Sequence, residues 1–314
     1  MDNFIFNLIM SVALLMLQNR SFDSLNSSFY KIFVKFFLQI ACLRYFYNNH
    51  LIMFEFPVVD RAIIKDFKRN YLKSVIFQVQ FEPNPEISSK RSEIAAIFID
   101  TFPNIEETSK PGFSVSFSPN QTPIIQPSIE KSGYRLRSAD DQEIISMDQQ
   151  SVTYTIAGRK YVNFDSSKRI LDDFRRIFKV ANITGFTRVA IRKLNIIDFQ
   201  IQEDSKIDLV SVSQLLLNPK LATDLSYFPQ IEYINQNFNT VTYVKESEGL
   251  NLRYGFQQQP NAAFTGQILI DIDRYTRSKI AQENLDNKLE EINIEIFNVF
   301  NWALSDEAID RLIK

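Results

Sequence analysis

Residues 166–199, SSKRILDDFRRIFKVANITGFTRVAIRKLNIIDF, decide the expected fold, because they place an amphipathic helix directly before a long strand. Apolar residues recur at helical spacing in the first part, and either Asp165 or Ser166 is a suitable N-cap. After Gly185 the pattern changes to an alternation of apolar and polar residues, which is typical of a half-buried strand. The apolar stripe of the helix consists of Ile170, Phe174, Ile177, Phe178 and Ala181.

The same two patterns recur on both sides of this stretch. SVIFQVQFEP (74–83), three short strands between 134 and 157, and three longer ones between 239 and 276 all alternate. The proline-rich residues 119–133 predict a long loop, and Ser305 with Asp306 predicts the cap of a last short helix. We therefore expect an α+β fold of curved antiparallel sheets, each packed on a helix. Residues 53–183 and 184–314 would form two structurally similar halves, joined side by side and ending in a long C-terminal helix from Leu285.

The composition excludes few functions but narrows the chemistry. The chain has 314 residues, 45% of them hydrophobic, and a net charge of −2, so it can bury a large core and has no global attraction for nucleic acid or anionic lipid. Its seven glycines argue against glycine-rich phosphate-binding loops. The single cysteine, Cys42, excludes an internal disulfide framework and fits a reducing compartment.

The first 52 residues differ in composition from the rest and leave three alternatives open. The run FIFNLIMSVALLML could belong to a secretory signal, but the leader MDN carries no base and no small-residue cleavage site follows. The second alternative is that this run or FVKFFLQIACL spans a membrane. Both are shorter than the ~20 apolar residues that a membrane span requires. The third alternative is a start assigned too far upstream, in which case Met53 begins the protein; we favour this one.

The inventory of reactive side chains argues against the common enzyme classes. The only histidine, His50, and the only cysteine both precede Met53, so residues 53–314 lack the usual base of a nucleophilic triad and the usual ligands of zinc. No dinucleotide fingerprint, phosphate-binding loop or nucleophile elbow occurs. An enzyme built on these residues would have to use carboxylates, Lys, Tyr or a metal bound through oxygen. We expect no cofactor.

One constellation could still carry chemistry. In ILIDIDRYT, Asp271 and Asp273 share a strand face and lie roughly 7 Å apart, close enough to hold Mg²⁺ or Mn²⁺. Arginines on the neighbouring strands could join them on a concave polar face and bind a phosphorylated ligand. The alternative, which we favour, is that these residues form cross-strand ion pairs on a solvated sheet face. The arginines concerned are Arg135, Arg137, Arg188 and Arg192.

The order and spacing of the segments resemble a sporadically distributed family of bacterial α+β proteins of unknown function. The segments that carry the resemblance are YLKSVIFQVQFEP, YRLRSADDQEIISMDQQSVTYTI, residues 164–199, and ILIDIDRYT followed by LDNKLEEINIEIFNVFNWALSDEAI. The family places Arg and Asn in the strand that here holds Arg192 and Asn195, which makes both candidate binding residues. Many members have a His near the position that Leu289 occupies here, so a role of that His in other members does not transfer to this chain.

The resemblance implies a bacterial cytoplasmic protein and brings no catalytic residues with it. We expect a non-enzymatic accessory protein that binds a protein partner, of the kind found in toxin–antitoxin or phage-defence loci. The alternative function is a metal-dependent phosphohydrolase or nucleotide-binding enzyme that uses Asp271, Asp273 and the sheet-face arginines. Membrane association would require residues 1–52 to be part of the protein.

Overall fold

The structure, a computed structural model, describes residues 56–60, 67, 70–116, 124–200, 209–225, 227–229, 234–258 and 265–313. Contacts divide the chain into two units, Met1–Met53 and Phe54–Lys314, and every described residue belongs to the second. The expectations for residues 1–52, and with them Cys42 and His50, lie outside the described residues.

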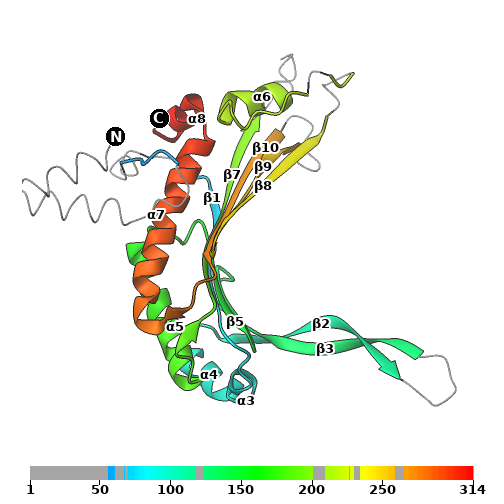
Figure 1. The fold of residues 1–314 in the computed structure, drawn as a ribbon, viewed down its shortest axis with the longest axis vertical. Helices are drawn as coiled ribbons and strands as arrows, with labels where there is room; N and C mark the ends of the chain where they lie inside the picture. Colours follow the sequence, from blue (N-terminus) through cyan, green and yellow to red (C-terminus); the bar gives the residue numbers. More distant parts are fainter. Residues whose placement is uncertain are drawn as a thin grey trace, which may run out of the picture. The chain divides into compact units, whose positions relative to one another are not determined.

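A single antiparallel sheet of nine strands organises the described residues (Figure 1). The order of its strands is β2-β3-β4-β5-β1-β7-β10-β9-β8. The fold is therefore α+β with antiparallel strands, as the sequence predicts. The strands are β1 (Leu72–Gln80), β2 (Asn104–Ser116), β3 (Ile124–Arg137), β4 (Glu143–Asp148), β5 (Ser151–Ala157), β7 (Arg188–Gln200), β8 (Gln236–Lys245), β9 (Glu248–Gln258) and β10 (Thr265–Thr276).

The strands of the two expected halves meet at the centre of this sheet. β1 from the first half pairs antiparallel with β7 from the second, so that Phe77 lies opposite Ile191. In each half the last strand of the hairpin series returns to the first strand: β5 pairs with β1, and β10 pairs with β7. The two strand groups thus lie side by side in one continuous sheet and do not form two separate sheets.

The two longest helices of the described residues, α5 and α7, lie on the same face of the sheet, one against each strand group (Figure 1). α5 belongs to the first group, and α7 contacts β7 and β10 of the second. A short 3₁₀ turn precedes each of them, and the pair β6 (Gly185–Phe186) and β11 (Ile280–Ala281) forms a small second sheet. The helices are α3 (Glu86–Ser89), α4 (Arg91–Phe98), α5 (Lys168–Val180), α6 (Leu209–Leu216), α7 (Leu285–Ala303) and α8 (Asp306–Ile313).

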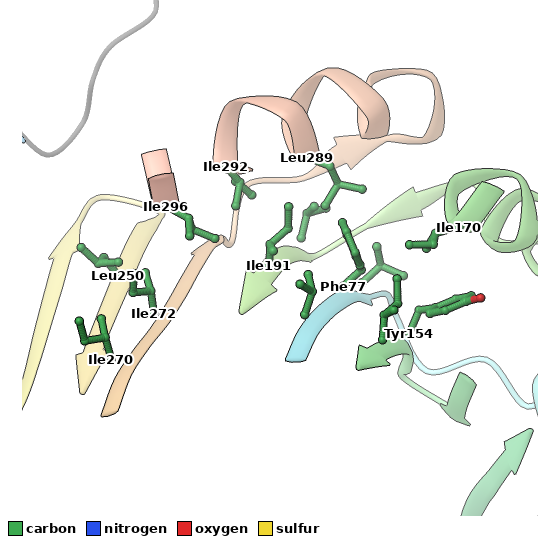
Figure 2. Close-up of a cluster of buried hydrophobic side chains, with 14 of the residues drawn as sticks. Phe77, Tyr154, Ile170, Ile191, Leu250, Ile270, Ile272, Leu289, Ile292 and Ile296 are labelled. Carbon is green, nitrogen blue, oxygen red and sulfur yellow. The ribbon is translucent and has the colours of Figure 1, made fainter. Parts of the chain in front are cut away.

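The core fills the layer between the helices and this face of the sheet. Figure 2 shows Leu289, Ile292 and Ile296 of α7 pointing toward the isoleucines of β7 and β10, while Phe77 and Tyr154 lie in the first group. Every residue of the expected α5 stripe is at most 2% exposed, so that prediction is confirmed. Such a continuous apolar layer is the main favourable term in the stability of the fold.

Two local predictions are wrong. Residues 124–133 are not a loop but the outer part of β3, which pairs with β2; only Gly133–Arg137 also pairs with β4. A proline such as Pro127 is tolerated there because the strand is paired on one side only. The N-cap of α5 is neither Asp165 nor Ser166 but Ser167, the last residue of the preceding 3₁₀ turn (Asp165–Ser167), and it makes no capping side-chain bond.

The cap of the last helix follows the sequence-based prediction. Ser305 precedes α8, and its Oγ accepts a hydrogen bond from the backbone N–H of Ala308 at 3.1 Å. Among the helices of the described residues, none combines the length and the apolar character needed to cross a membrane.

Candidate functional site

The four central candidate residues lie together on the sheet face opposite α5 and α7. On β7 and β10, Arg188, Arg192, Asp271 and Asp273 alternate with the buried Ile191 and Ile272 and therefore lie on the other face of the sheet. The two pairs that form are diagonal. Arg192 donates through Nε and Nη2 to both carboxylate oxygens of Asp271, at 2.8 and 2.6 Å. Arg188 donates through Nη2 to both oxygens of Asp273, at 3.2 Å each.

These pairs satisfy the carboxylates instead of leaving them for a metal. Asp271 is only 5% exposed, and Asn251 gives Asp273 a further hydrogen bond at 3.2 Å. The hydrogen bond to Asp271 raises the pKa of the Arg192 guanidinium, which therefore stays charged. No group of three or more His, Cys, Asp or Glu side chains that could hold a metal occurs within the described residues. The geometry fits cross-strand ion pairs and gives the hydrolase hypothesis no support.

Arg135 and Arg137 share this sheet face but not this cluster. Both alternate on β3 with the buried Tyr134 and Leu136. Four strand spacings separate β3 from β7, which is roughly 19 Å. Arg137 is instead paired locally, with Glu106 at 2.8 Å. The structure therefore does not bring all the expected arginines to one site.

Asn195 lies on the other face, under the helices. It alternates with Val189 and Ile191, is 5% exposed, and donates through Nδ2 to the backbone carbonyl of Ile270 at 3.2 Å. The two residues that the resemblance singles out, Arg192 and Asn195, thus point to opposite sides of β7. They cannot contact the same ligand.

A buried ion cluster beneath α7 is not among the candidates that the sequence predicts. Arg274 lies on the same inward face of β10 as Ile268, Ile270 and Ile272. Its guanidinium carries a full positive charge, yet the residue is only 1% exposed. It pairs with Glu248 of β9 at 2.6 Å and with Glu295 of α7. The signal was present, because a charge in register with three buried isoleucines has to find a partner.

The two acids of this cluster respond to burial differently. Burial acts to raise the pKa of both carboxyl groups, but the net direction differs. At Glu248 the charge and hydrogen bond of Arg274, helped by Thr276 and Lys288, outweigh burial and bring its pKa below the ordinary value. At Glu295 burial dominates, and its pKa remains raised. The cluster holds α7 on the sheet and has the character of a structural element.

A titratable group outside this cluster, Asp173 of α5, gives a testable pH dependence. Burial raises its pKa to about 6, although Arg169 and Arg176 act in the opposite direction. Since the folded protein then holds this proton more tightly than the unfolded chain, stability is lost as the pH rises from about 4 to about 6.

We expect Asp173→Asn to raise the free energy of unfolding at pH 7 by roughly 2 kcal/mol and to flatten its slope between pH 4 and 6. Urea unfolding at several pH values measures both. Asp172→Asn, the same change at an exposed neighbour, serves as the control. An Asp173→Asn protein that is less stable than the parent at pH 7, with an unchanged slope, would contradict the assignment.

The two edges of the sheet differ in a way that bears on binding. The β2 edge carries Glu106, Glu107, Lys110 and Pro111, the residue types that block strand pairing. The β8 edge, QNFNTVTYVK, has no charge before its last residue and no proline. It runs for ten residues and exposes 63% of Val244. Among the described residues β8 pairs with β9 alone.

The hydrogen-bonding groups of β8 alternate in direction. The N–H of Gln258 in β9 donates to the carbonyl of Asn235 at 2.8 Å, and the register puts these two residues opposite each other. Since hydrogen-bonded pairs recur at every second residue of an antiparallel ladder, the odd-numbered residues of β8 bond to β9. The even-numbered ones, with Thr240 at the centre, point their N–H and C=O groups away from the sheet.

Comparison of the chain with protein-family models found no match, and comparison with curated proteins found no significant sequence match.

Proposed function

We propose that this protein is a non-enzymatic binding protein that accepts an extended segment of a partner protein along the outer edge of β8. The observation that carries the proposal is the outer edge of that strand, with which no other strand of the described residues pairs. Five of the ten residues of β8, the even-numbered ones, direct their N–H and C=O groups outward and form a template for an added strand, whose main-chain hydrogen bonds give affinity.

The side chains of this edge favour a protein ligand. Tyr243 is 38% exposed and Val244 63%, and both offer apolar area to an incoming strand. Arg253 lies over the ring of Phe238 at 4.7 Å on the face opposite the helices. Aromatic residues and arginine are enriched where proteins bind each other. The proposed mode thus combines backbone pairing with apolar contacts on both sides of the strand.

The cellular setting belongs to the same proposal. The resemblance to a patchily distributed bacterial family supports a place in the bacterial cytoplasm. It also supports a role as an accessory of a toxin–antitoxin or phage-defence locus. The paired state of Asp271 and Asp273 supports a role without catalysis.

Thr240→Pro tests the proposal, because proline removes an outward N–H while the ladder to β9 keeps its bonds. Tagged full-length protein is used to capture partners from an extract of the native host, and the bound proteins are quantified by mass spectrometry. We expect a stoichiometric partner on the parent, and recovery at least about tenfold lower on Thr240→Pro.

Thr240→Val is the matched control, since it keeps the N–H and the strand geometry and should retain the partner. Circular dichroism establishes that both variants are folded. Equal recovery on Thr240→Pro and the parent would overturn the proposal, and so would the absence of any stoichiometric partner on the parent.

A further inference from the structure

A cavity lies on the helix-covered side of the sheet, where the two strand groups join. Its volume is about 320 Å³. Leu72 of β1 and Asn195 of β7 contribute to its floor, and α7 contributes Asn293 and Ile296, the latter labelled in Figure 2. The segment between β5 and α5 supplies Tyr161 and its neighbours. The cavity is therefore built by both halves of the chain and is separate from the β8 edge.

Two buried asparagines give the cavity its polar character. Asn195 is 5% exposed and Asn293 is 3% exposed. Asn195 uses its Nδ2 on the carbonyl of Ile270, and Asn293 uses its Oδ1 to accept a hydrogen bond from Lys193 Nζ at 2.7 Å. Neither the Oδ1 of Asn195 nor the Nδ2 of Asn293 has a hydrogen-bond partner within the part of the chain that the structure describes.

These two groups define what a ligand must present. Neither atom is among the fully buried side-chain atoms that lack a partner, so both are accessible from the cavity. A ligand that offers a donor to Asn195 and an acceptor to Asn293 would bond to both. Lys193 does not require an anion there. Its Nζ already bonds to Asn293 and lies 5.3 Å from the centre of the Tyr161 ring.

The remaining walls favour a flat ring. Phe164 comes from the segment before α5, and Phe297 and Phe300 come from α7. Aromatic faces stack on planar heterocycles, and such rings also carry donors and acceptors along one edge. The volume lies at the lower end of the roughly 300–1,000 Å³ typical of small-molecule sites, which limits the ligand to about one ring system with a small substituent.

We infer that this cavity binds an uncharged nucleobase or nucleoside, with Asn195 accepting from the edge of the base and Asn293 donating to it. The aromatic side chains hold the plane of the ring. The site does not depend on the proposed protein partner, because none of its residues lies on β8.

Isothermal titration calorimetry of the full chain with adenosine, guanosine, cytidine and uridine tests the inference. We expect at least one to bind with a Kd in the micromolar range. Asn293→Asp keeps an oxygen for Lys193 but loses the donor to the ligand, and Asn195→Leu loses the acceptor. Each should weaken binding at least about tenfold, because a partner of the base is then missing.

Asn298→Asp is the matched control: it makes the same change on the same helix, at a buried residue that does not line the cavity and whose Oδ1 accepts from Val59. Binding should survive that change and also Thr240→Pro. The inference is overturned if no nucleoside binds at about 1 mM, or if the one that binds does so equally well to Asn293→Asp and Asn195→Leu.

Discussion

Arg274→Met is expected to lower the free energy of unfolding by about 3–5 kcal/mol, because it leaves two buried carboxylates without their common partner. Arg274 is 1% exposed, and Nη1 donates to Glu248 at 2.6 Å and also to the carbonyl of Tyr275, while Nε donates to Glu295. Lys288, 3.2 Å from Glu248, compensates only one of the acids well. Methionine fills much of the arginine volume, so the loss is one of charge and hydrogen bonds.

Urea unfolding monitored by circular dichroism measures this effect. Arg175→Ala is the control: its partners Asp172 and Asp286 are exposed, so it should cost less than about 1 kcal/mol. If the two variants lose the same stability, the buried cluster does not hold α7 on the sheet in the way the contacts indicate.

Phe77→Ala is expected to cost about 3–5 kcal/mol and to shift the unfolding of the whole sheet. Phe77 is 1% exposed on β1, between Tyr154 of β5 and Ile191 of β7. It therefore stands at the junction of the two strand groups. If these groups unfold as one cooperative unit, a cavity at the junction lowers the stability of both.

The single tryptophan, Trp302, reports on the second group and circular dichroism on the whole chain. We expect both signals to shift to the same lower urea midpoint. Val162→Ala, at a side chain that is 79% exposed, should leave both midpoints unchanged. Two separate transitions, with Trp302 unaffected by Phe77→Ala, would show that the halves unfold independently.

The elements that could be predicted from the sequence are those whose periodicity comes from a single buried face. α5 and α7 show an apolar stripe, and β1, β7 and β10 alternate, because each has the core on one side only. The pairing of β1 with β7 could only be suspected, since strand partners distant in sequence leave no local pattern. The outer part of β3 was missed because its prolines indicate a loop wherever the strand's neighbours are unknown.

The candidate site was predicted in part. Alternation placed Arg188, Arg192, Asp271 and Asp273 on one face, and the structure confirms their pairing as ion pairs. The separation of Arg135 and Arg137 from them depends on strand order, which the sequence does not encode locally. The β8 edge and the cavity at Asn195 depend on which strand ends the sheet and where α7 crosses it. Neither follows from residue spacing.

Amide hydrogen exchange of the protein bound to its captured partner, read residue by residue, tests the central claim most directly. Strand addition to β8 predicts slowed exchange at the outward amides of Thr240, Thr242 and Val244, with little change at the inward amides between them. Slowed exchange confined to the face that carries Arg192, with β8 amides exchanging as in the free protein, would contradict it.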